Sequence, residues 1–389
     1  MVVILTLRAR IVWSSPEGRS TTPRRVHISM KTSFFKSALI IPIAGLSLTG
    51  LALAQDGAQT TPSTPRFVTL PAKPSTNGAA PAVTLPTWNG SFVYSGHTYN
   101  YNMVGTAPST GSSTTVPVFI IPIKVIVTKG TTKKQFDPAH VLTNGKTVIQ
   151  NTVASPLFDS TTTYTQGGVD VGTTQYIDAY QRANFWGTVK THPGYHVLFG
   201  APTVLAEQTV KPPTSKGTYG PEFGFTAGEV DINWLDLQFQ TILAKFPQIQ
   251  PNTLPIFLLY NVYLTSGGCC IGGYHSATGP QAYSMTTYAD HVGAFSQDVS
   301  ALSHELGEFM DDPLVVNTNG NPVACGILEN GDPLENNPNF GAFPYSVNGF
   351  LYNLQDLVTL PYFGAPPSTS VKGFFTFQGE TLSVCQNGG

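Results

Sequence analysis

Apolar residues recur at helical spacing along residues 297–312, and this is the clearest pattern of hydrophobic and polar positions in the chain. At about 100° per residue, one side of the predicted helix carries Val299, Leu302, Leu306, Phe309 and Met310. The opposite side carries one histidine among acidic and small residues, namely Ser300, Ala301, His304, Glu305, Glu308, Asp311 and Asp312. We expect Ser296 to cap this helix, Asp298 to lie in its first turn and Pro313 to end it.

The remaining segments mix strand and helix patterns. The predicted elements are a strand at 116–128, helices at 173–186 and 229–246, and strands at 254–264 and 281–288. Two prolines in the first strand suggest an edge position or a bulge, and a Gly/Cys loop is expected between the last two strands. After Pro313 the chain is rich in loop residues, with 350–360 as its best-ordered segment. The pattern therefore predicts an α+β fold with a loop-rich C-terminal segment.

Three segments precede the predicted folded domain, which we place at 87–389. Residues 30–54 have a basic start, an apolar stretch and a small-x-small end at Ala52–Ala54, as in a signal peptide. Residues 1–29 are then interpreted as lying upstream of the true start, and 55–86 as a Pro/Thr/Ala-rich linker. The alternative is that Ala38–Ala54 is an uncleaved anchor, which is short for a bilayer span. We expect a secreted protein with no membrane span after signal cleavage.

The charge content is low. The 389 residues carry a net charge of −2, and only 11% are charged. Nucleic-acid binding needs clustered lysine and arginine, so this composition excludes it as a partner. There is also no G-x-S-x-G motif and no Gly-rich phosphate loop.

The acidic face of the predicted 297–312 helix carries the motif H-E-x-x-E-x-x-x-D-P. His304 and Glu308 are separated by four residues, so both can reach one metal ion, and Glu305 can act as general base toward water at that ion. The alternative is a solvated acidic helix face. Against this, Lys and Arg are absent from 274–356, so these acids have no nearby partners in sequence.

These residues resemble a family of secreted bacterial zincin-like proteins of the metallopeptidase type. The resemblance rests on Ser303–Pro313 and on an E-x-G-D turn at Glu329–Asp332. A Gly273-Tyr274-His275 loop adds a more distant similarity to plant phosphate-induced, exordium-like extracellular proteins. The resemblance implies a zincin-like metallopeptidase lobe, with His304 and Glu308 as metal ligands and Glu305 as base. The exordium-like proteins are associated with cell-surface and growth roles.

The third metal ligand is open between three carboxylates. Glu329 lies close to the spacing at which thermolysin-like zincins take their third ligand, although Asn330-Gly331 is typical of a turn. Asp312 and Asp332 are the alternatives, and Asp312 can instead cap the helix end. We expect Zn²⁺, but two carboxylate ligands weaken the preference for zinc, so another divalent metal also fits.

The cysteines and the G-Y-H loop provide further candidates. We favour disulfides that join Cys269 and Cys270 each to Cys325 or Cys385, because a bond between neighbours closes a strained ring. His275 is a candidate catalytic residue that stabilises an oxyanion, and Tyr274 is a candidate substrate-binding residue. The alternative for His275 is a structural role.

Three functions remain in competition. The first is a secreted metal-dependent peptidase that hydrolyses a peptide or protein substrate. The second is a catalytically inactive zincin-like domain that binds a surface glycan or protein, and the third is a hydrolase of non-peptide substrates. Only the two enzymes require Glu305.

Overall fold

The computed structural model describes residues 66–74, 83–317, 328–335, 337, 342–379, 382 and 385. All of them belong to one compact unit, Thr60–Gly389. The predicted signal peptide at 30–54 and the segment before it lie outside the described residues, as does Cys325. Among the helices of the described residues, none has the length and apolar character needed to cross a bilayer.

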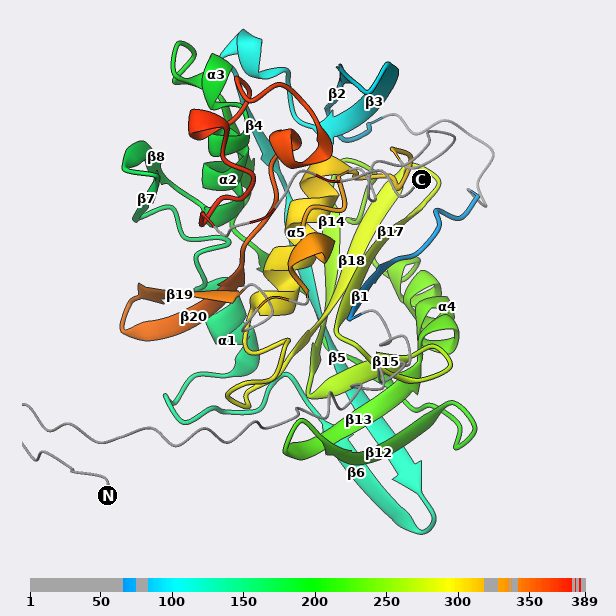
Figure 1. The fold of residues 1–389 in the computed structure, drawn as a ribbon. Coiled ribbons are helices and arrows are strands. Elements are labelled where there is room, and N and C mark those ends of the chain that lie inside the picture. The colour runs from blue at the N-terminus through cyan, green and yellow to red at the C-terminus, as the bar shows by residue number, and fades with distance from the viewer. Residues whose placement is uncertain are drawn as a thin grey trace, which may run out of the picture. The chain divides into compact units, whose positions relative to one another are not determined.

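An eight-stranded mixed sheet forms the centre of this unit (Figure 1). Its strands run in the order β1-β17-β18-β14-β5-β10, and β6 and β11 also pair with β5. The neighbours β18, β14 and β5 are parallel, whereas β17 is antiparallel to β18. The strands are β1 (Phe67–Thr69), β5 (Val118–Lys129), β6 (Thr132–Phe136), β10 (Thr203–Val204), β11 (Gln208–Val210), β14 (Leu254–Tyr260), β17 (Gly273–Thr278) and β18 (Gln281–Tyr288).

Helices cover both faces of this sheet, and these are α4 (Ile232–Leu243) and α5 (Ser300–Asp311). Side chains alternate between the faces of a strand, so Ile121 packs in one core cluster with Phe239 of α4. Ile120 packs in the other cluster with Leu306 of α5. Both faces of the central strands are therefore buried, which explains the almost continuous apolar run of β14.

Smaller elements surround the sheet. A second, four-stranded sheet contains β12 (Gly217–Glu222), β13 (Phe225–Asp231), β15 (Val262–Thr265) and β16 (Cys269–Ile271). The paired strands elsewhere are β2 (Thr87–Tyr94) with β3 (His97–Val104), β4 (Ser113–Val116) with β9 (His196–Phe199), β7 (Thr162–Gln166) with β8 (Val169–Thr174), and β19 (Ala342–Val347) with β20 (Phe350–Gln355). The other α-helices are α1 (Val148–Val153), α2 (Tyr176–Asn184) and α3 (Trp186–Val189).

The mixed α+β class and several predicted elements are confirmed. Strand β18 matches the predicted strand 281–288, and α5 lies within the predicted helix 297–312. Helix α4 is also present, but it begins at Ile232, because the Asp231 side chain caps it by accepting from the Trp234 amide. The predicted strand 254–264 is two strands, since the chain turns at Asn261, with a φ of 51°, and enters the second sheet.

The prolines of the strand at 116–128 suggested an edge position or a bulge, and the edge position is wrong. Strand β5 pairs with β14 on one side and with both β10 and β11 on the other. Pro122 falls between the residues that these two short strands pair with, Ile120 and Ile123. The proline is therefore accommodated by a break in the neighbouring strand rather than by an edge.

Three other local predictions differ from the structure. The predicted Gly/Cys loop contains β16 and the whole of β17, because Gly273–Thr278 pairs along its full length with β18. The cap of α5 is Val299 without a side-chain bond, since the Ser296 hydroxyl instead donates to the Tyr263 hydroxyl. The predicted linker 55–86 contains β1, which pairs with β17 and extends the sheet.

Asp298 joins the start of α5 to β20, and its loss should destabilise the fold. The buried carboxylate accepts from the Asn353 backbone amide at 2.9 Å, the Asn353 side chain at 2.6 Å and the Val299 amide at 2.5 Å. Asp298→Ala leaves these donors unpaired and should lower the free energy of unfolding by about 2–3 kcal/mol. Denaturant unfolding measures this. Asp290→Ala is the control, since exposed Asp290 also accepts two side-chain bonds. Equal losses of unfolding free energy in Asp298→Ala and Asp290→Ala would contradict the structural role assigned to Asp298.

Candidate metal centre

Helix α5 turns His304, Glu305 and Glu308 toward strand β17. All three side chains are buried, and the His304 Nε2 atom lies 2.9 Å from Glu308 Oε1. Residues 304 and 308 are one turn apart, which brings the imidazole and the carboxylate together as the sequence predicts. The apolar face of the helix, including Leu306, packs into the core and fixes the direction in which these polar groups point.

His275 approaches the same carboxylates from β17. Its Nδ1 atom lies 3.3 Å from Glu308 Oε2 and 3.6 Å from Glu305 Oε2. The two oxygens of Glu308 therefore face different histidines, His304 through Oε1 and His275 through Oε2. The side chain of His275 is only 1% exposed, so it belongs to the cluster itself rather than to a loop that contacts solvent.

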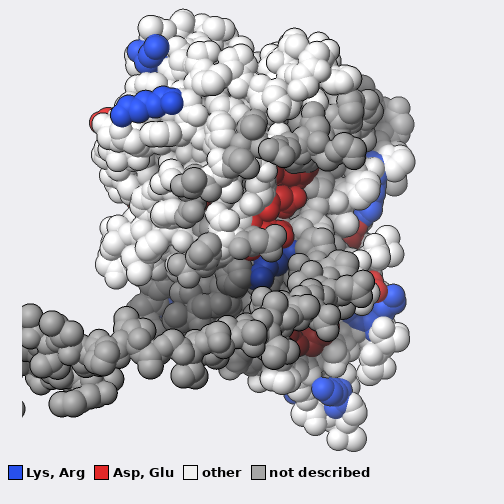
Figure 2. All heavy atoms as spheres, viewed as in Figure 1, with Lys and Arg blue, Asp and Glu red and all other residues white. Residues whose placement is uncertain are grey.

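The turn at residues 329–332 completes the cluster. Asp332 Oδ1 lies 3.5 Å from His304 Nε2, and Glu329 accepts a 2.5 Å bond from the Thr69 hydroxyl. The turn is attached to α5 because the Asn330 side chain donates to Asp311 at 2.9 Å. The Asp332 side chain is 43% exposed, so the cluster reaches solvent on this side. Figure 2 shows acidic side chains gathered in a hollow near the middle of this face.

Gln355 fixes the protonation of the His304 ring. The Gln355 side-chain nitrogen donates to the Gly331 carbonyl at 3.1 Å, so its oxygen faces His304 Nδ1 at 2.7 Å. The oxygen can only accept, and Nδ1 must therefore carry the hydrogen. This leaves Nε2 directed toward Glu308 and Asp332, in the tautomer and orientation of a metal ligand.

Two close approaches hold the His304 ring in place. The Phe67 ring of β1 stacks on it with centroids 3.9 Å apart and planes 24° apart. On another side, a Cβ added to Gly331 would lie 2.2 Å from His304 Nδ1. Residue 331 must therefore be glycine for this packing, although its φ of −92° is open to any residue.

The donor atoms of the cluster fit a metal ion. Several of them are buried without a hydrogen-bond partner among the described residues, namely both ring nitrogens of His275, His304 Nε2, both oxygens of Glu305, Glu308 Oε1, Glu329 Oε1 and Asp332 Oδ1. Such atoms normally have partners. Ligands about 2.1 Å from one ion lie roughly 3.0–3.4 Å apart in octahedral or tetrahedral geometry. The donor separations of 2.9–3.6 Å are close to this range.

Two overlapping sets of residues have the proximity needed to hold a cation. One set is His275, Glu305 and Glu308, and the other is His304, Glu308 and Asp332. Glu308 belongs to both sets because its two oxygens face different histidines. Nitrogen and oxygen donors of this kind suit zinc, and the excess of carboxylates also admits harder divalent ions.

Burial and mutual attraction shift the pKa values of these groups in opposite directions. Burial raises the pKa of Glu305 to about 8, although His275 partly offsets this effect. Burial acts on Glu308 as well, but attraction to His304 and His275 outweighs it and holds the pKa of Glu308 at about 2. For both histidines, the surrounding carboxylates outweigh burial and raise the pKa well above its ordinary value. The cluster thus favours positive charge at its centre.

Two candidate residues lie outside the cluster. The Asp312 carboxylate accepts from the backbone amides of Val316 and Asn317, so it closes the turn after α5. This is the capping role that the sequence left open. Tyr274 points to the opposite face of the sheet, where its hydroxyl donates to Asp236 at 2.9 Å. The substrate-binding role expected for Tyr274 therefore does not fit, because neighbouring residues of a strand face opposite sides.

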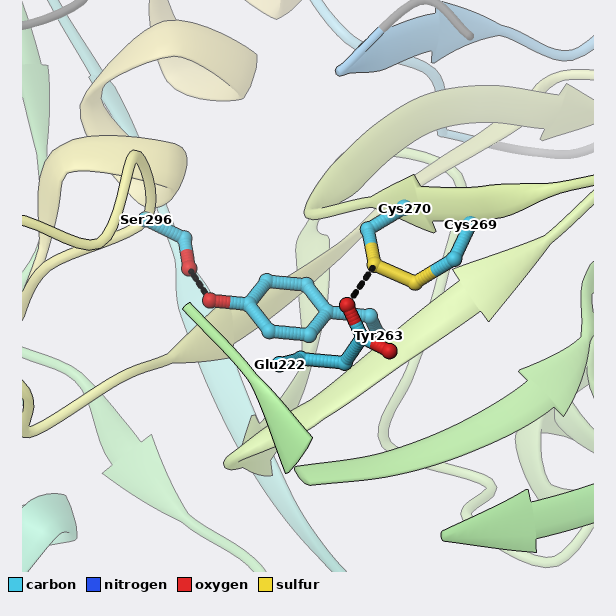
Figure 3. Close-up of a disulfide and its surroundings, with 5 residues drawn as sticks. All are labelled: Glu222, Tyr263, Cys269, Cys270 and Ser296. Carbon is cyan, nitrogen blue, oxygen red and sulfur yellow. Dashed lines mark hydrogen bonds between the residues drawn. A yellow bond between two sulfur atoms is a disulfide. The ribbon is translucent and has the colours of Figure 1, made fainter. Parts of the chain in front are cut away.

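The expected pairing of Cys269 and Cys270 with Cys325 or Cys385 is not seen among the described residues. Cys269 and Cys270 lie side by side in β16, next to Glu222 and Tyr263 (Figure 3). Cys385 packs in a different core cluster, where its amide donates to the Tyr362 carbonyl. This separation places Cys385 away from the Cys269/Cys270 pair. Cys325, the other expected partner of Cys269 or Cys270, lies outside the described residues.

Sequence reasoning missed three residues that shape the site. Phe67 and Thr69 come from the predicted linker, and Gln355 comes from a segment predicted only to be ordered. Nothing in the spacing of these residues relates them to His304. The signal that was available is Gly331, whose place in the E-x-G-D turn marks a close backbone approach.

Comparison of the chain with protein-family models, with curated proteins and with solved structures finds no match. The case for a function therefore rests on the residues of the site.

Gly331→Ala should disrupt the site without a general loss of stability. The added methyl group overlaps His304 Nδ1, so the ring must move away from Gln355 and from the other ligands. A displaced ligand or supporting partner typically costs about 10–100-fold in metal affinity. Calorimetric titration with Zn²⁺ measures this. Gly220→Ala is the matched control, because its Cβ would meet only Glu229 at 3.6 Å. Unchanged zinc affinity in Gly331→Ala would contradict the proposed ligand role of His304.

Proposed function

We propose that this chain is a secreted metal-dependent peptidase with a zincin-like arrangement around α5. The observation that carries the proposal is the buried cluster of His275, His304, Glu305 and Glu308, whose donor atoms lack hydrogen-bond partners and lie at ligand distances. His275 and His304 face the buried carboxylates of Glu305 and Glu308, but Glu329 and Asp332 add further negative charge, so a bound cation would stabilise the cluster. Zinc is the ion that best suits two imidazoles with carboxylates.

The position of the cluster supports the zincin-like part of this proposal. Helix α5 crosses one face of a mixed sheet, and the antiparallel strand β17 lies beside it. Helix α4 supports the opposite face. The side chains of the H-E-x-x-E motif thus project from α5 toward a strand near the edge of the sheet, as the sequence resemblance implies.

Different residues of the chain have different roles in the proposed reaction. A bound divalent ion would polarise a carbonyl group and make water more acidic at neutral pH. His304 Nε2 and Glu308 would hold the ion, and Gln355 keeps the His304 ring in the required tautomer. Glu305 packs against Gly273 of β17 and, as the carboxylate, would accept the proton from the attacking water.

His275 has a different role from the one that its sequence position suggests. It is buried against Glu305 and Glu308 rather than placed in a loop at the surface. We assign it to metal binding and to the orientation of Glu308, in place of oxyanion stabilisation. Glu329 and Asp332 remain alternative carboxylate ligands, and the contact of Asp332 with His304 favours Asp332.

Burial of the cluster favours a second candidate function. His304, Glu305 and Glu308 are at most 1% exposed, which suits a structural ion in a catalytically inactive extracellular binding domain. In that case Glu305 would have no role as a base. Metal binding without turnover in any form of the protein would support this second function.

Removal of a metal ligand should remove the metal. His304→Ala and Glu308→Ala should each purify with far less than one ion per chain, whereas the secreted wild-type chain should hold at least one. Elemental mass spectrometry measures the content. His196→Ala is the control, because His196 pairs with Asp178 away from the cluster. Full metal content in both ligand variants would mean that the ion lies elsewhere.

Removal of the base should separate catalysis from binding. Glu305→Gln keeps the size of the side chain but cannot accept the proton, so peptide hydrolysis should fall by about 10²–10⁴-fold. The metal content should not change. Hydrolysis of unfolded protein and short peptides near neutral pH provides the assay, with Glu207→Gln as a surface control. Equal turnover by wild type and Glu305→Gln would assign the hydrolysis to another site.

A further inference from the structure

We propose that the edge of β17 beside the cluster is a peptide-binding edge, and that residues 66–73 of this chain occupy it as an intramolecular pseudosubstrate. This segment must leave before another peptide can reach His304. The role of this edge in peptide hydrolysis rests on the proposed function, whereas its occupation by residues 66–73 rests on the contacts of that segment.

The segment binds as an added strand. Residues Phe67–Thr69 pair with Gly273–His275 in parallel register. Beyond this register, the Gly272 amide donates to the Arg66 carbonyl at 2.7 Å, and the Lys73 amide donates to the Ala277 carbonyl at 2.8 Å. Main-chain bonds of this kind are how a sheet edge captures an extended peptide. The same edge would accept another peptide once this segment is displaced.

The segment also contacts the cluster at two points and a neighbouring carboxylate at a third. The Phe67 ring stacks on His304, and the Thr69 hydroxyl donates to Glu329. The Phe67 amide donates to Glu335 at 2.9 Å, next to the 329–332 turn. An occupant of this edge therefore places an aromatic side chain over a metal ligand and a hydroxyl two residues later.

The attachment of the segment is narrow. Phe67 is its fully buried side chain, at 2% exposure, whereas Pro71, Ala72 and Pro74 are exposed. Proline cannot donate to a strand partner, so Pro71 interrupts the pairing before Lys73. The segment has one fully buried side chain, while Val68 and Leu70 are partly buried against the core cluster on the α4 side and Lys73 pairs with Asp236. Its detachment should still cost less than that of an interior strand such as β14, which is buried on both faces.

The ligand class follows from these contacts. The edge should bind an extended peptide that carries an aromatic residue over His304, and a small hydroxyl residue facing Glu329. Acidic peptides should bind poorly, because Glu329, Asp332 and Glu335 lie along the path.

Release of the segment in the intact protein is the direct test. A protease recognition sequence is placed between residues 75 and 82 of the full secreted chain, and the zinc-loaded protein is then cut. We expect the N-terminal fragment to separate in gel filtration, and a chelator to extract zinc about tenfold faster or more. A synthetic peptide of residues 64–75 should restore slow extraction, whereas the same peptide with Phe67→Ala should not. A cut placed at Gly130, in the β5–β6 turn, is the control.

Point variants test the anchor without cutting. Phe67→Ala should accelerate zinc extraction, because it uncovers His304. Val68→Ala is the matched control, since Val68 packs on the opposite face of the same strand. Equal extraction rates in the two variants would overturn the proposal.

The outcomes separate this inference from the proposed function. A fragment that stays bound after cutting, or a cut protein that unfolds, would show that residues 66–73 are a permanent strand and would overturn the inference. If the purified chain holds no metal, the proposed function fails, and binding of a fluorescent 64–75 peptide to the cut protein then decides the inference. Release and rebinding without any peptide hydrolysis would support the inference and contradict the peptidase.

Discussion

The site depends on the positive charge that stabilises buried carboxylates in α5, a helix that packs against a sheet. Glu308 lies between two histidines, with one oxygen toward His304 and the other toward His275. Positive charge near this carboxylate offsets the cost of burying it, and its pKa falls to about 2 although burial alone would raise it. Helix α5 and strand β17 can therefore meet through polar side chains only while the two histidines, or an ion bound by them, supply that charge.

The supporting contacts come from parts of the chain that are distant in sequence. Gln355 of β20 bonds to His304 and to Gly331, so one side chain joins the helix, the hairpin and the 329–332 turn. Asp311 holds the same turn through Asn330. These bonds fix the His304 ring before any ion arrives, which is the condition for a rigid metal site.

The sequence predicts the elements of the site better than it predicts their partners. Apolar spacing locates α5, α4 and β18, because each element has one strong period and a buried face. The i and i+4 spacing also brings His304 and Glu308 together. Pairing between strands leaves no such local signal, so β1 in the predicted linker and the strand that carries His275 could not be found. Tyr274 was misplaced for the same reason, since alternation assigns it to the other face only after residue 274 is known to lie in a strand.

The position of β1 connects the electrostatics of the cluster to its accessibility. A peptidase requires its metal ion to meet substrate, yet the ligand His304 is covered by Phe67, a residue of the edge strand β1. If β1 were as deeply anchored as β14, burial would be permanent and the cluster could serve only as a structural centre. The edge position and the prolines around Phe67 instead allow the cover to be removed while the sheet, α5 and Gln355 keep the ligands in place. The same cluster is then consistent with a stable, closed form and with an open form whose ligands are already oriented.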